Sequence, residues 1–185
     1  MKVKDIIASA LKLLGRADLV SALSGLSKAD KEGQELIDTL VYCFNAVEDE
    51  LARKYIPLTE KEDLASPDTL FFYNSFLHNP VRIKRVTVGG KSVKYEVFAR
   101  YLCVQAENIT VEYDYAPARK ELDGDSDYGK EAGEYLFALG IAAEYSLING
   151  EAEMAEKWEK KYREQLDGIQ RTLPACEKIP PRRWI

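Results

Sequence analysis

The spacing of apolar residues changes twice along this chain, and this change constrains the fold more than any other feature. Apolar residues recur every three or four positions up to about residue 57, alternate with polar residues from Val81, and return to the helical spacing at about residue 128. Spacings of three and four indicate amphipathic helices, whereas strict alternation indicates half-buried strands. The predicted order is two helices, up to four strands and two further helices.

Two helices are expected on each side of the strands. The first covers residues 3–23, with a break or bend at Gly15 as an alternative, because glycine weakens a helix interior. The second covers residues 31–55 and ends before Pro57. The third begins at about residue 128 and the fourth at Glu151, so the short loop between them predicts an antiparallel helical hairpin. The apolar positions of the second and fourth helices are Leu36, Leu40, Phe44, Val47, Leu51 and Tyr55, and Ala155, Trp158, Tyr162, Leu166 and Ile169.

The central strands are expected to form one small antiparallel sheet of three or four strands. Gly89-Gly90 stands where a two-residue hairpin turn is needed, between two runs of alternating residues. Residues 58–80 are mixed, and Thr59 with Glu62 fits a capping box for one short helical turn. The strands themselves are expected at residues 81–88, 93–97, 100–105 and 108–115.

These elements predict an α+β fold. We expect a mostly helical bundle with four main helices, an inserted small antiparallel β-sheet and an extended C-terminal arm. The bundle takes residues 1–57 and 128–173, the β-rich insertion takes residues 58–127, and the arm takes residues 174–185. The arm follows from Pro174, Pro180 and Pro181, which do not continue a helix.

The net charge of −5 and the isoelectric point of about 5.1 argue against a domain that grips nucleic acid with a basic face. A local basic patch near the C-terminus stays open as an alternative. No apolar run approaches the roughly 20 residues that cross a membrane, and no signal peptide is expected. The odd number of cysteines, three, fits reduced thiols better than disulfides.

The residue types that perform catalysis are few or scattered. His78 is the only histidine and precedes Asn79-Pro80, so we interpret it as a loop or subunit-contact residue. One histidine and three separated cysteines do not make a zinc site, and no glycine pattern fits a phosphate-binding loop. We therefore expect no enzyme, no catalytic residues, no cofactor-binding residues and no cofactor.

The acidic loop at residues 123–134 is the one motif that resembles a metal site. Asp123, Asp125, Asp127 and Glu134 fall at positions that bind calcium in a calcium loop. However, Tyr128 stands where such a loop needs glycine, and a strand precedes it instead of a helix. We therefore assign no metal and interpret the loop as a flexible acidic connection. A metal-dependent small enzyme or nucleic-acid-processing factor that uses residues 123–134 is kept as the alternative function.

The C-terminal arm carries the strongest functional indication in the residues themselves. Tryptophan and arginine are preferred anchors of protein interfaces, and a segment stiffened by proline loses less entropy when it docks. A disordered end is the competing interpretation, and two arginines with one tryptophan are too few for stable membrane anchoring. We assign partner binding to Ile179, Pro180, Pro181, Arg182, Arg183, Trp184 and Ile185.

Four segments together resemble the head–tail connector (adaptor) proteins of tailed bacteriophages and prophages. The first is the end of the second helix, at residues 48–57, and the second is the last strand, at residues 109–117. The third is the helical hairpin at residues 142–155 with the aromatic positions that follow it, and the fourth is Pro181-Arg-Arg-Trp184. None of these segments is a catalytic signature, so the resemblance concerns architecture.

The resemblance implies a viral structural protein of virion assembly. It would form an oligomeric ring of about twelve copies below the portal protein and continue the DNA channel to a downstream tail or stopper protein. DNA would pass through the lumen without specific binding, which the acidic charge favours. The protein would be located at the head–tail joint of the virion, and in the host cytoplasm before assembly, with no membrane partner. Another tail-completion protein is the second alternative.

Overall fold

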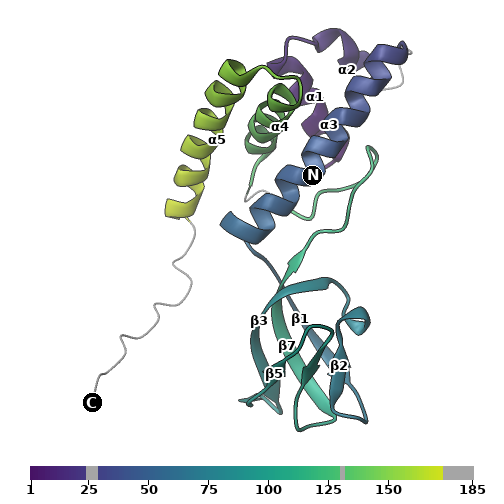
Figure 1. The fold of residues 1–185 in the computed structure, drawn as a ribbon, viewed down its shortest axis with the longest axis vertical. Coiled ribbons are helices and arrows are strands. Elements are labelled where there is room, and N and C mark those ends of the chain that lie inside the picture. The colour runs from purple at the N-terminus through teal and green to yellow at the C-terminus, as the bar shows by residue number, and fades with distance from the viewer. Residues whose placement is uncertain (24–28, 130–131, 173–185) are drawn as a thin grey trace.

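The structure is a computed structural model that describes residues 1–23, 29–129 and 132–172, with the side chains of 170–172 excluded. In these residues it contains five α-helices at one end of the molecule and seven β-strands at the other (Figure 1). The helices are α1 Val3–Leu13, α2 Val20–Leu23, α3 Lys31–Glu50, α4 Glu134–Ile148 and α5 Ala152–Thr172. The strands are β1 Leu58–Ala65, β2 Leu70–Phe72, β3 Asn79–Val88, β4 Lys91–Ser92, β5 Glu96–Val97, β6 Tyr101–Cys103 and β7 Asn108–Ala116.

The first predicted helix is interrupted. α1 ends at Leu13 because Gly15 adopts φ +73°, a left-handed conformation that glycine accepts at little cost. A short 3₁₀ turn, Ala17–Leu19, then leads into α2. The single helix expected at residues 3–23 is therefore two helices with a turn between them.

α3 follows the predicted apolar stripe closely. The Asp30 side chain accepts a hydrogen bond of 2.8 Å from the backbone N–H of Gly33 and so caps the first turn. The stripe from Leu36 to Leu51 is buried against α1 and α4, and the Phe44 and Phe137 rings lie 5.4 Å apart. A π-helical turn, Leu51–Tyr55, ends the element before Pro57.

α4 and α5 form the predicted helical hairpin. α4 is buried on most of its circumference, whereas α5 buries Tyr162 and Leu166 and leaves its other side in solvent. Gly150, at φ +76°, makes the turn between them. Trp158, which the spacing places in the core, is only half-buried, and Lys161 Nζ lies 4.8 Å from its ring centre.

The strands form two antiparallel sheets that enclose their own core. The larger sheet has the order β1-β7-β3-β4 and the smaller has the order β2-β6-β5. Their shared core consists of Phe71, Phe76, Val86, Leu102, Val104, Ile109, Val111 and Tyr113. These residues are separate from the core of the helices, so the strands are called the β unit below and the helices the helical unit.

The prediction of a mostly helical bundle with four main helices and one small sheet is wrong. The described residues contain five helices, and the β unit has seven strands in two sheets. β1 and β2 occupy the segment that was expected to be mixed, and Thr59 and Glu62 belong to β1 rather than to a capping box. Half-buried positions of β1 alternate with exposed ones, as expected of a strand. Two of the half-buried positions are Glu60 and Glu62, so the sequence lacks the alternation of apolar and polar residues that predicts a strand.

The connection from the β unit back to α4 is a long segment tied to the helical unit. Its residues form backbone hydrogen bonds with the first residues of the chain. The Val3 N–H donates to the Gly124 carbonyl at 3.0 Å, and the Ser126 N–H donates to the Met1 carbonyl at 2.8 Å. α4 begins at Glu134 rather than at about residue 128, because Gly133 has φ +69° and Tyr128 is buried in the core of the helical unit. The predicted domain boundaries stay a prediction.

Candidate functional site

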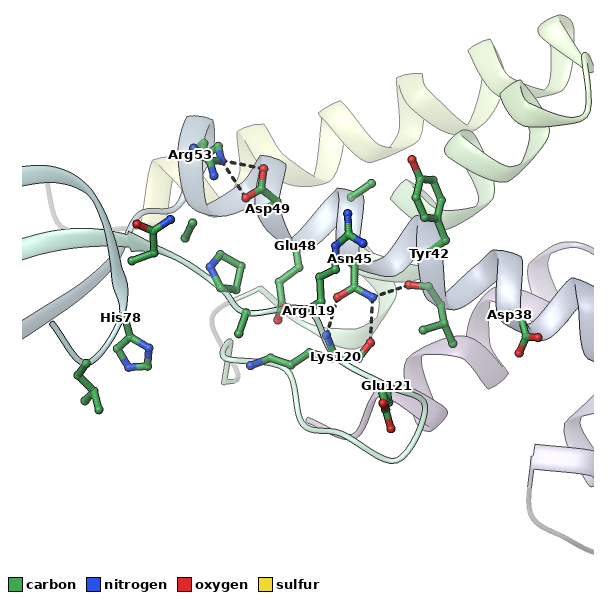
Figure 2. A pocket seen from close by; sticks show the side chains of 17 residues that line it. Asp38, Tyr42, Asn45, Glu48, Asp49, Arg53, His78, Arg119, Lys120 and Glu121 are labelled. Carbon is green, nitrogen blue, oxygen red and sulfur yellow. Dashed lines mark hydrogen bonds and ion pairs between the residues drawn. The ribbon is translucent and has the colours of Figure 1, made fainter. Parts of the chain in front are cut away.

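A groove of about 890 Å³ lies where the helical unit meets the β unit. One wall is the side of α3 that faces away from α4, and the opposite wall is the segment from Ala116 to Glu121, which we call the strap (Figure 2). Residues 77–79, just before and at the start of β3, close the end nearest the β unit. The groove is therefore built by segments far apart in the sequence.

Asn45 fixes the strap to α3. Its side-chain Nδ2 donates a hydrogen bond of 3.0 Å to the Lys120 carbonyl, and its Oδ1 accepts one of 2.7 Å from the Lys120 backbone N–H. The same Nδ2 also donates to the Val41 carbonyl at 2.8 Å, which holds the amide in one orientation (Figure 2). One side chain thus sets the width of the groove at its middle.

Glu48 lies in the floor of the groove and is fully buried. Its Oε1 accepts hydrogen bonds from the Ser126 hydroxyl at 2.6 Å and from the Asp127 backbone N–H at 3.0 Å. Its Oε2 has no hydrogen-bond partner among the described residues. Burial is the main reason that the pKa of the Glu48 carboxyl is raised above its ordinary value. The floor therefore contains an acceptor that lacks a donor.

The charged side chains of the groove are only partly paired with one another. Arg53 Nε contacts an Asp49 carboxylate oxygen at 2.7 Å, and Lys120 Nζ contacts Asp127 Oδ1 at 2.6 Å. Three other charged residues line the groove without an ion pair to any described residue: Asp38, Glu121 and Arg119. Among the described residues that line the groove, two exposed carboxylates, Asp38 and Glu121, therefore outnumber the one unpaired cation, Arg119.

His78 lies at the end of the groove near the β unit, in the loop where the sequence places it. Its ring stacks on Tyr115 with 4.2 Å between ring centres and an angle of 15° between the planes. Its backbone N–H donates to the Tyr113 hydroxyl at 3.3 Å. These contacts give His78 a packing role at the junction of the two units.

The acidic loop does not bring its carboxylates together. Asp125 contacts Lys2 Nζ at 2.6 Å, Asp127 contacts Lys120, and Glu134 accepts a hydrogen bond from the Ser9 hydroxyl. Among residues 1–23, 29–129 and 132–172, no group of three or more histidine, cysteine, aspartate or glutamate side chains could hold a metal ion. Asp125 and Glu134 therefore connect this loop to the helical unit, and Asp127 connects it to the strap.

The predicted partner-binding residues, Ile179 to Ile185, lie outside the residues that the structure describes. The sequence did not reveal the groove, because its walls come from α3, the strap and residues 77–79, and no local pattern relates these segments. Asn45 was the one residue that could have indicated a contact at this surface, because it is a polar residue beside the apolar stripe of α3.

No model of a known protein family matches the chain, and no curated protein matches it either. Within the parts of the chain that the structure describes, no helix combines the length and apolar character needed to cross a bilayer.

Proposed function

We propose that this chain is a structural subunit of a bacteriophage or prophage head–tail connector, which assembles as a ring below the portal protein and continues the DNA channel to the tail. The resemblance in sequence supports this proposal, and one structural observation carries it. Large apolar side chains are exposed on both units of a molecule that is elongated in Figure 1.

The first exposed patch is at the turn between α4 and α5, and we call it the helical-end patch. It consists of Leu147, Ile148 and Met154, whose exposed fractions are 62%, 53% and 39%. This turn lies at the end of the helical unit that points away from the β unit (Figure 1). Exposed apolar side chains that cluster in this way are typical of interaction sites.

The second exposed patch is on the small sheet of the β unit, and we call it the small-sheet patch. Its members are Phe72, Val97 and Phe98, with exposed fractions of 49%, 60% and 42%. Tyr101 joins them, because its ring stacks on Phe98 at 4.8 Å and contacts Phe72 at 5.6 Å. Aromatic residues of this kind are enriched at the centres of protein interfaces.

Two different patches, one on each unit, suit a protein that joins two different partners. A connector subunit meets the portal at one end and a tail or stopper protein at the other, which requires two distinct surfaces. Contacts between unlike surfaces of neighbouring copies also generate rings. The net charge of −5 favours a lumen along which DNA slides without sticking.

The test is to mix the purified chain with the portal protein of the same phage or prophage and to examine the mixture by electron microscopy and native mass spectrometry. We expect a ring of the chain stacked on the portal. The double variant Leu147→Ser with Ile148→Ser and the double variant Val97→Ser with Phe98→Ser should each remove the contact made by one of the two patches. Val81→Ser, an exposed apolar position outside both patches, is the matched control.

Two results would contradict the proposal. The first is a chain that stays monomeric and does not bind the portal under conditions where the portal itself is intact. The second is unchanged assembly, with the portal and with the tail or stopper protein, in both patch variants.

A further inference from the structure

The groove between α3 and the strap has the chemistry of a site for a basic peptide. Asp38 and Glu121 are exposed at its mouth, and Glu48 lies in its floor with Oε2 lacking a donor. Two of the three cations that line it are already held, Arg53 by Asp49 and Lys120 by Asp127. An incoming guanidinium would give the exposed carboxylates of Asp38 and Glu121 the charged donor that they lack.

The groove also offers apolar contacts. Tyr42 and Leu77, which lie toward its two ends, are among the most exposed large hydrophobic side chains of the described residues. Pro117 and Val41 add apolar surface to the walls. Tyr42 lines the groove, and its ring extends from α3 on the side away from the strap (Figure 2), where an aromatic or proline side chain of a ligand would stack on it. The fitting ligand therefore combines arginine with large apolar residues.

The chain itself contains such a segment. Residues 179–185 read Ile-Pro-Pro-Arg-Arg-Trp-Ile, with two adjacent cations between proline and tryptophan. α5 ends at Thr172, and the 13 residues from 173 to 185 follow it in the sequence. A fully extended segment of that length spans about 40 Å.

We propose that residues 179–185 of one subunit bind in the groove of a neighbouring copy. In this arrangement Arg182 and Arg183 meet the carboxylates of Asp38 and Glu121, and Trp184 packs on Tyr42. The proposal rests on the proposed ring, because a segment passed from each copy to the next is a contact between unlike surfaces that closes a ring. It assigns the segment to the neighbouring subunit rather than to the portal.

A photo-crosslinking experiment on the full chain tests this assignment. p-Benzoylphenylalanine replaces Trp184, and subunits with and without ¹⁵N label are mixed, assembled and irradiated. We expect cross-links between residue 184 and α3 or the strap, and we expect them to join labelled to unlabelled chains.

Charge reversal at the mouth of the groove provides the second measurement. Asp38→Lys with Glu121→Lys should reduce the yield of these cross-links about tenfold, because each change replaces an attraction by a repulsion. Asp68→Lys, an exposed acid between β1 and β2 that does not line the groove, should leave the yield unchanged. Circular dichroism of each variant confirms that the helices are retained.

Three outcomes would overturn the inference. The first is cross-links that join only chains of the same label, which would place the segment in the groove of its own subunit. The second is cross-links that map outside the groove. The third is a cross-link yield that does not change when Asp38 and Glu121 are replaced. Portal binding is measured separately. A chain that fails to bind the portal but shows mixed-label cross-links in the groove contradicts the connector function and supports the exchanged segment.

Discussion

Gly140 is the position at which a single added methyl group tests the packing of the helical unit most sharply. A Cβ atom placed there would lie 2.9 Å and 3.0 Å from the two methyl carbons of Val47 and 3.0 Å from Cε2 of Tyr162. α3 and α5 therefore both approach α4 at this residue. Val47 and Tyr162 are each 2% exposed, so neither side chain can move into solvent without opening the core.

The magnitude follows from two opposing effects. Replacing glycine by alanine within a helix stabilises it by about 1 kcal/mol. Forcing an extra methyl group into a filled core costs about 1–3 kcal/mol, and three contacts at or below 3.0 Å place Gly140→Ala toward the upper part of that range. The net expectation is a loss of about 1–2 kcal/mol in the free energy of unfolding.

The assay is urea unfolding followed by circular dichroism, on Gly140→Ala and on two companion variants. Gly168→Ala is the matched control, because Gly168 lies in α5 with no atom within 4 Å of the added Cβ, so it should raise stability by about 0.5–1 kcal/mol. Val47→Ala removes two of the three close contacts. In that background, Gly140→Ala should cost close to nothing.

A Gly140→Ala variant that is as stable as the parent chain would refute this reasoning. It would mean that α4 does not lie as close to α3 and α5 as the structure has it. A loss that persists unchanged in the Val47→Ala background would show that the contact with Val47 is not its cause.

Three further predictions concern buried polar groups. Burial raises the pKa of Glu48 above its ordinary value of 4.5, so the folded state binds more protons than the unfolded state. The free energy of unfolding should therefore fall as the pH rises from 4.5 through the pKa of the folded state. Glu48→Gln should remove this fall, as measured by urea titrations at pH 5 and pH 7.5. Tyr113→Phe should cost about 1–3 kcal/mol in the same assay, because the hydroxyl donates to Glu62 at 2.7 Å, and an unchanged midpoint would argue against that bond. Burial raises the pKa of the Cys43 thiol to about 12, so iodoacetamide at pH 8 should modify the half-buried Cys103 at least about tenfold faster, as measured by mass spectrometry.

The helices could be predicted where the spacing of apolar residues follows directly from which side of the helix is buried. α3 repeats apolar residues from Leu36 to Leu51 at helical spacing, and the turn at Gly150 needed only a residue that accepts positive φ. The start of α4 could not be placed, because Tyr128 is buried like a helix residue while its backbone belongs to the preceding loop. Periodicity reports burial, and irregular segments can be buried too.

The strand β1 and the groove were missed for a related reason. Glu62 occupies an inward position of β1 because the Tyr113 hydroxyl, far away in sequence, donates to it. Asn45 holds the strap by hydrogen bonds to the backbone of Lys120, and no residue near Asn45 in the sequence indicates this partner. Both features depend on contacts between distant segments, which single-sequence patterns do not contain.

The packing of α1 against α4 has a consequence for the order in which the chain folds during synthesis. The apolar face of α1, made of Val3, Ile6, Ile7, Ala10 and Leu11, buries itself largely on a helix that begins only at Glu134. The β unit is contiguous in sequence and can close as soon as β7 has left the ribosome. Until α4 is made, α1 can pack only on α3, so part of its apolar face stays uncovered in the nascent chain and can aggregate.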